Sequence, residues 1–226
     1  QAEPGSTVTV TYPDGTTATV VAGTDGSWSV PNPGNLVDGD TVTATATDPA
    51  GNTSGPATAV VDAVAPTVAL DDVLTSDSTP ALTGTVSDPT ATVVVNVDGT
   101  DYPAVNNGDG TWTLVDNTLP TLADGPHTIT VTATDAAGNV GTDTGVVTVD
   151  TTAPAAPVID PVNGTDPITG TAEPGSTVTV TYPDGSTASV VAGPDGTWTV
   201  PNPGLNDGDT VTAVTEDPAG NTSGPA

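Results

Sequence analysis

Basic residues are absent from this sequence of 226 residues. It contains no lysine and no arginine against 28 aspartates and glutamates, and its formal net charge is −28. A surface of that charge repels polyanions, so nucleic acids and anionic membranes are excluded as partners. With no basic side chain to pair with, every carboxylate must be solvated, hydrogen-bonded or bound to an inorganic cation. Cations are therefore the partners that the composition favours.

Sulfur and large aromatic side chains are equally scarce. Cysteine, methionine and phenylalanine are absent, and only three tryptophans and three tyrosines are present. Disulfides are therefore excluded, and the cores must consist mainly of valine, alanine and a few leucines and isoleucines. One cation that binds only the folded state, at about 100 times its dissociation constant, adds about 2.7 kcal/mol to the stability of a small domain. We expect such an ion to contribute to folding.

Catalysis and membrane insertion are not expected. Without cysteine, lysine and arginine, and with a single histidine, nucleophile–base pairs and cationic oxyanion clamps are missing, so the sequence does not predict an enzyme. No apolar run approaches the roughly 20 residues that a membrane helix needs, so we expect no membrane insertion of this segment. Because methionine is absent, we expect the sequence to be part of a longer protein.

An internal repeat organises the chain. Residues 2–15 return without change as residues 172–185, and a more distant relative lies between the two copies. The repeat predicts three modules in tandem. These are the first module (residues 1–65, lacking strand A and most of strand B), the middle module (residues 66–153, complete) and the third module (residues 154–226, lacking strand G).

Threonine and apolar residues alternate through the chain, as half-buried antiparallel strands require. In one such segment Ile129, Val131 and Ala133 share a face, and threonines occupy the other. Asp-Gly and Asn-Gly pairs supply the positive φ angles of tight hairpins. The middle module is predicted to have seven strands, lettered A to G in chain order, at residues 67–73, 81–87, 92–97, 102–105, 111–115, 128–134 and 144–149. The sequence therefore predicts an all-β fold of tandem seven-stranded β-sandwich domains, the terminal ones incomplete in this window.

One loop motif occurs once in each module. It reads Asp-(Pro/Ala)-Ala-Gly-Asn and occupies residues 48–52, 135–139 and 217–221, between strands F and G. Aspartate, proline, glycine and asparagine are turn residues, and aspartate caps its own backbone, so an ordinary turn is one interpretation. A turn does not need the carboxylates Asp62 and Asp150 in the two linkers, which favour a cation site as the other interpretation.

Successive strands of a sandwich alternate in direction, so the BC and FG loops of one module face the end of strand G of the module before it. Three carboxylates and an amide would then converge at each junction and repel one another unless a cation lay between them. Calcium accepts about six to eight hard oxygen ligands in tolerant geometry, whereas zinc prefers histidine or cysteine and magnesium demands a near-ideal octahedron. The predicted calcium ligands are Asp62, Asp88, Asp135 and Asn139 at the first junction, Asp150, Glu173, Asp217 and Asn221 at the second, and the matching Glu3, Asp48 and Asn52 of the first module.

Two further sets of residues follow from the same reading. Trp28, Trp112 and Trp198 each follow an Asp-Gly turn at the start of strand E, and we predict that all three are core residues. Weaker ligand candidates in the EF loops, at the opposite pole, are Asp38, Asp40, Asp207 and Asp209.

The chain resembles the bacterial immunoglobulin-like repeats of giant surface adhesins, of the RTX and biofilm-associated type. The resemblance rests on the FG loop motif, on the Val-Asp-x-x-Ala-Pro linkers at residues 61–66 and 149–154, and on the Asp-Gly-x-Trp turns. It implies immunoglobulin-like domains that act as a passive extender at the bacterial cell surface, with calcium stiffening the junctions between neighbouring repeats of one long chain. Such a segment would be extracellular and would support surface attachment and biofilm formation.

Two other functions remain open. The incomplete terminal modules would allow self-association into an extracellular filament, in which a neighbour supplies the missing strand. The loops at one pole would alternatively bind a glycan or a protein, which predicts a cluster of exposed aromatic residues. The sequence offers no such cluster.

Overall fold

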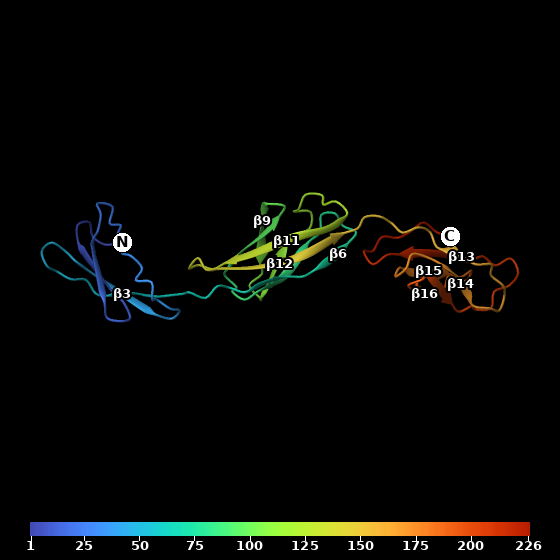
Figure 1. The fold of residues 1–226 in the computed structure, drawn as a ribbon, viewed down its shortest axis with the longest axis horizontal. Coiled ribbons are helices and arrows are strands. Elements are labelled where there is room, and N and C mark those ends of the chain that lie inside the picture. Colours follow the sequence, from blue (N-terminus) through green and yellow to red (C-terminus); the bar gives the residue numbers. More distant parts are fainter. The chain divides into compact units, whose positions relative to one another are not determined.

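The computed structural model describes residues 1–226 and contains strands β1 to β18 and no helix (Figure 1). The prediction of an all-β fold of tandem sandwich domains is confirmed. No helix has the length and hydropathy that crossing a membrane requires. The chain divides into two compact units, residues 1–66 with 134–141 and residues 67–133 with 142–226.

The middle module is built from eight strands. They are β5 (Val68–Leu70), β6 (Val73–Thr75), β7 (Leu82–Val86), β8 (Thr92–Val97), β9 (Thr100–Asn106), β10 (Thr111–Leu114), β11 (Gly125–Thr134) and β12 (Val140–Val149). Their order in the sheet is β5-β7-β10-β9-β8-β11-β12-β6, and β11, β12 and β6 lie side by side in Figure 1. Because β9 pairs with both β8 and β10, the two halves of the sandwich are joined along that edge.

Strand A is the element on which the sequence prediction was wrong. It was predicted as one strand at residues 67–73, but it divides into β5, which pairs antiparallel with β7, and β6, which pairs parallel with β12. Two carboxylates satisfy backbone N–H groups next to this switch: the Leu70 N–H donates to Asp143 Oδ2 (3.0 Å), and the Val146 N–H donates to Asp72 Oδ1 (2.9 Å). The seven predicted strands therefore become eight.

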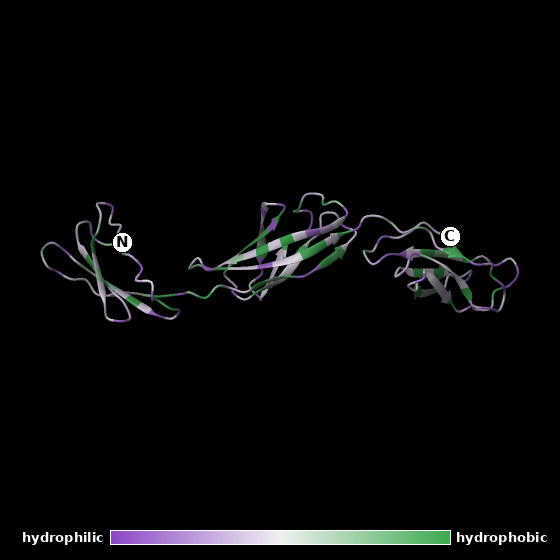
Figure 2. Cartoon of the chain, viewed as in Figure 1, coloured by the Kyte–Doolittle hydropathy of each residue, from purple (hydrophilic) through white to green (hydrophobic).

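The core of the middle module follows the predicted alternation. Ile129, Val131 and Ala133 of β11 are fully buried, whereas the threonines between them are not; Figure 2 shows such alternation as green and pale bands along the strands. Trp112 is fully buried, and its indole N–H donates to the Ala69 carbonyl oxygen (2.9 Å). Its position as a core residue is confirmed.

The third module consists of two three-stranded sheets. Its strands are β13 (Val158–Ile159), β14 (Ile168–Thr171), β15 (Thr177–Thr181), β16 (Thr187–Val191), β17 (Thr197–Val200) and β18 (Thr212–Glu216). The sheets have the orders β13-β14-β17 and β16-β15-β18. Ile168 of β14 and Trp198 of β17 belong to the core between them, which confirms the prediction for Trp198.

The first module has only one sheet. Its strands are β1 (Thr7–Thr11), β2 (Thr17–Val21), β3 (Thr41–Thr47) and β4 (Ala57–Val60), in the order β2-β1-β3-β4. Trp28 belongs to no strand and is half-buried, so it differs from the predicted core tryptophan. Trp112 and Trp198 are covered by strands β7 and β14, and no strand of the first module pairs with the segment that carries Trp28.

Candidate functional site

The FG loop forms the same hydrogen-bonded clasp in all three modules. In the first module the backbone N–H of Asn52 donates to Asp48 Oδ1 (2.8 Å), and its side-chain amide donates to Asp48 Oδ2 (2.7 Å). The matching bonds of Asn139 to Asp135 are 2.8 and 2.9 Å. Those in the third module are 2.9 and 2.8 Å. Both carboxylate oxygens are thus engaged within five residues, as the turn interpretation requires.

The hydrogen bonds of the clasp stabilise the ionised carboxylates. The side-chain amides of Asn52 and Asn139 are the main reason that the pKa values of Asp48 and Asp135 lie below the ordinary value. For Asp217 burial raises the pKa, but the hydrogen bonds from the side chain and backbone of Asn221 outweigh it, so this pKa is lowered too. All three aspartates are therefore held as anions at neutral pH.

Two of the three clasps reach a linker. The side-chain amide of Asn139 also donates to the backbone carbonyl oxygen of Asp62 (3.1 Å), and that of Asn221 donates to the carbonyl oxygen of Asp150 (2.6 Å). Asn52, at the same position of the first module, bonds only within its own loop. The FG asparagine therefore fixes the linker aspartate that precedes its module, through an atom that the sequence reading did not consider.

The EF loops hold the linkers as well. The carboxylate of Asp124 accepts the backbone N–H (3.0 Å) and hydroxyl (2.7 Å) of Thr151 and the hydroxyl of Thr152 (2.9 Å). Asp38 plays the corresponding part in the first linker, where it accepts the N–H of Ala63 (3.1 Å). Sequence reasoning missed Asp124 and considered Asp38 only as a ligand, because an Asp-Gly turn gives no signal of what its carboxylate reaches.

Two further hydrogen bonds to backbone carbonyl oxygens lie beside the second linker. The Ser76 N–H donates to the Ala219 carbonyl oxygen (3.0 Å), and the Thr215 hydroxyl donates to the Ala155 carbonyl oxygen (3.0 Å). Each linker is thus bonded both by the module before it, through an EF-loop aspartate, and by the module after it, through the FG asparagine.

The remaining predicted ligands are engaged locally. The Asp88 carboxylate accepts the N–H and the hydroxyl of Thr90, both at 2.8 Å. Glu3 and Glu173 use their backbone carbonyl oxygens to accept the hydroxyls of Ser6 and Ser176. No group of three or more histidine, aspartate or glutamate side chains is placed to hold a metal ion. The assignment of these residues as calcium ligands stays a prediction.

The donor groups at the first junction nevertheless suit a hard cation. The amide nitrogen of Asn139 lies 2.9 Å from Asp135 Oδ2 and 3.4 Å from Asp62 Oδ1, so two carboxylates approach one amide. Because the chain contains no lysine or arginine, only neutral N–H groups meet these carboxylates: this amide and the backbone N–H groups of Ala137, Asn139 and Val64. Carboxylate and carbonyl oxygens are the ligands that calcium prefers, so the residues present fit calcium by chemistry.

Tandem small β-sandwiches with short, doubly bonded linkers define a modular structural protein. The chain belongs to the bacterial immunoglobulin-like domains: the Bacterial Ig domain family matches residues 1–63 and 153–226, and the Bacterial Ig-like domain family matches residues 66–151. These are structural modules without catalytic activity, which confirms that the chain is not an enzyme. No curated protein matches the chain significantly.

Several solved structures are similar to the chain. One is a tetra-tandem repeat in the extending region of a large adhesion protein (29% identity, TM-score 0.37), which covers 100% of this chain and 66% of its own. A second is a 1.5-MDa bacterial ice-binding adhesin (27% identity, TM-score 0.37), and the match covers 98% of this chain and 84% of that one. A third is a Ca²⁺-stabilized adhesin with which an Antarctic bacterium binds ice (29% identity, TM-score 0.37), and the match covers 99% of this chain and 63% of that one. The chain spans less than two thirds of the first and third of these structures.

Proposed function

We propose that this chain is an extender segment of a bacterial cell-surface adhesin, which holds a binding domain away from the cell and so supports surface attachment and biofilm formation. The observation that carries the proposal is the pair of doubly bonded linkers. A linker fixed by hydrogen bonds from both flanking modules restricts bending between them, and restricted bending is what a stalk needs to project its tip. The partners are the neighbouring repeats, and the location is extracellular.

The absence of cysteine allows a direct test of stiffness. Spin labels on Val105→Cys and Val191→Cys, both at exposed positions, report the distance across the second junction. A stalk gives a narrow distance distribution, and Asn221→Ala, which removes the bond to the linker carbonyl, broadens it. Asn52→Ala, whose side chain reaches no linker, serves as the control and leaves the distribution unchanged. A broad distribution in the unmodified protein would refute the stalk.

We propose further that calcium binds at the junctions, with Asp62 and Asp135 as the carboxylates at the first of them. When bound, the ion would supply the positive charge that the sequence lacks. The side-chain amide of Asn139 now points its N–H groups at both carboxylates, so it would have to rotate before its carbonyl oxygen could serve as a ligand. The net charge of −28 supports the proposal, because each bound divalent cation reduces the repulsion within the chain.

Thermal unfolding tests the calcium proposal. We expect calcium at about 100 times its dissociation constant to add about 2.7 kcal/mol to the affected module, relative to EDTA, with magnesium and sodium chloride of equal ionic strength as controls. Asp62→Asn removes the carboxylate and keeps the backbone carbonyl that Asn139 uses, so it should lose the calcium increment and keep the hydrogen bond. Asp98→Asn, an exposed aspartate outside every predicted ligand set, is the matched control. If calcium and magnesium stabilise the protein equally, the effect is charge screening and the calcium proposal is refuted.

A further inference from the structure

The two linkers of this chain are a matched pair. They occupy the same sequence pattern, Val-Asp-x-x-Ala-Pro, at residues 61–66 and 149–154, and differ only in the two middle residues, which are Ala-Val in the first and Thr-Thr in the second. Both contain the same local turn, in which the linker aspartate accepts the N–H of the residue two positions on, at 3.2 Å in the first linker and 3.0 Å in the second. The two middle side chains are therefore the difference in sequence between the linkers.

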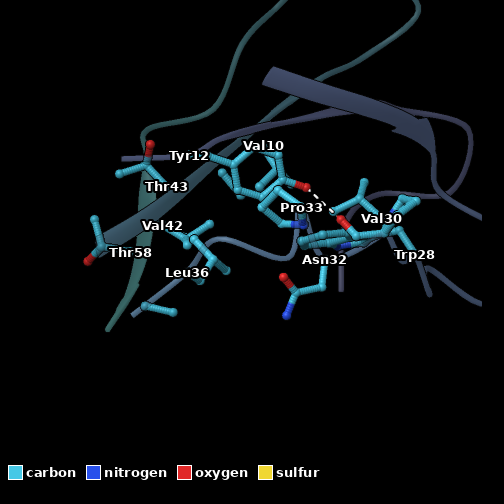
Figure 3. Close-up of a pocket in the computed structure, with 14 residues that line it drawn as sticks. Val10, Tyr12, Trp28, Val30, Asn32, Pro33, Leu36, Val42, Thr43 and Thr58 are labelled. Atoms are coloured by element: carbon cyan, nitrogen blue, oxygen red, sulfur yellow. Dashed lines mark hydrogen bonds between the residues drawn. The ribbon is translucent and has the colours of Figure 1, made fainter. Parts of the chain in front are cut away.

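The EF loops that hold the linkers are matched as well. A leucine two residues before the EF aspartate packs inward in each module: Leu122 is buried in the core of the middle module, and Figure 3 shows Leu36 beside Val42 in the first module. Each aspartate then accepts the N–H of the residue after the linker aspartate, at 3.1 Å for Asp38 and 3.0 Å for Asp124. The same backbone contact is thus present at both junctions.

The second junction adds two hydroxyl groups to this contact. The Asp124 carboxylate also accepts the hydroxyls of Thr151 (2.7 Å) and Thr152 (2.9 Å). Hydrogen bonds to a carboxylate are about twice as strong as bonds between neutral groups, and the Thr151 hydroxyl is the main reason that the pKa of Asp124 lies below its ordinary value. At the first junction Ala63 and Val64 carry no hydroxyl, so the EF aspartate receives the backbone N–H alone.

The FG side of the two junctions differs in the same direction. The bond from the FG asparagine to the linker carbonyl oxygen measures 3.1 Å at the first junction and 2.6 Å at the second. The FG aspartate of the third module, Asp217, is buried, whereas Asp135 of the middle module is half-buried. One of the two compact units of the chain holds most of the middle module together with the third module. The second linker is therefore held more firmly from both sides.

We propose that the second junction is a specific interface, in which Asp124 recognises the two hydroxyls of a Thr-Thr linker, and that the stalk bends at the first junction, where the Ala-Val linker offers none. The middle and third modules then form one rigid building block. This unequal pair of junctions presupposes the stalk of the proposed function, but the two can fail separately. A broad distance distribution across the second junction refutes the stalk, whereas equally narrow distributions across both junctions refute only their inequality.

Spin labels at equivalent positions compare the two junctions on the full chain. Val21 and Val191 occupy the same position of the repeat and are both 61% exposed, and Val105 of the middle module is 55% exposed. Cysteines at 21 and 105 report the first junction, and cysteines at 105 and 191 report the second, both in EDTA so that calcium does not contribute. We expect the wider distribution across the first junction.

Two reciprocal double variants assign the difference to the hydroxyls. Thr151→Val with Thr152→Val removes them at exposed positions and should widen the distribution across the second junction. Ala63→Thr with Val64→Thr supplies them beside Asp38 and should narrow the distribution across the first. Thr142→Val with Thr144→Val, which removes two exposed hydroxyls that make no hydrogen bond, is the matched control and should change neither.

Amide hydrogen exchange measures how firmly each linker is held. The N–H groups of Ala63 and Thr151 donate to the EF aspartate alike, so their protection factors compare directly. The two additional hydroxyl bonds should protect the Thr151 N–H about tenfold more strongly than the Ala63 N–H. The double valine variant should lose this factor, and the double threonine variant should gain it. The proposal is overturned if the two N–H groups are equally protected, or if neither double variant changes protection or width.

Discussion

The FG asparagines allow one prediction in which the chain supplies its own control. Asn52, Asn139 and Asn221 occupy the same position of the same loop, but only Asn139 and Asn221 also donate to a linker carbonyl, of Asp62 and Asp150 respectively. Replacement of each by alanine removes the side-chain bond within the loop in all three cases. In the middle and third modules it also removes the bond to the linker carbonyl oxygen, which joins neutral groups and is worth about 0.5–1.5 kcal/mol. Asn139→Ala removes in addition the long contact of 3.4 Å to Asp62 Oδ1.

The expected result is therefore a difference between modules. Asn139→Ala and Asn221→Ala should each lower the free energy of unfolding of their module by about 1 kcal/mol more than Asn52→Ala lowers that of the first module. This corresponds to about 4–8 °C in the midpoint of a domain of 60–100 residues. Urea unfolding followed through the indole N–H resonance of the one tryptophan in each module measures the three values separately. Equal losses in all three modules would show that the linker bonds contribute nothing.

The other predictions concern packing and pH. Gly170→Ala should destabilise the third module by about 1–3 kcal/mol, because an added Cβ would collide with the Val158 carbonyl oxygen and with the Trp198 indole ring. Gly224→Ala, where an added Cβ meets nothing within 4 Å, should be close to neutral in the same denaturation assay. Hydrogen bonds from Asn52 lower the pKa of Asp48 from its ordinary value of 3.8, so this carboxylate stabilises the fold above that pH and the contribution disappears as the pH falls through the lower, folded-state pKa. The unfolding midpoint of the Asp48→Asn variant should accordingly depend less on pH in that acidic range than the midpoint of the Asp207→Asn variant. Asp207 is the control because its carboxylate accepts no hydrogen bond. Parallel curves of midpoint against pH for the two variants would contradict this assignment.

Strand positions and buried faces could be predicted because both depend on neighbours in sequence. A segment such as residues 128–134 places its alternate residues on opposite faces whatever it pairs with, and an Asp-Gly pair forms a tight turn wherever it stands. The clasp of the FG loop is local for the same reason, since it closes within five residues. Its aspartate and asparagine were singled out from sequence, and their mutual bonds account for the turn interpretation.

The sequence by itself therefore determined the all-β class, the tandem modules, the family and the loops that meet the linkers. Only the tertiary structure decided which atoms meet: the FG asparagines reach the linker carbonyls, Asp124 holds the second linker, and strand A divides between two partners. It also decided that Trp28 borders an open groove while Trp198, with the same local sequence, is buried. The physical reason is that these contacts join residues far apart in the chain, whose proximity depends on strand pairing and not on any local pattern.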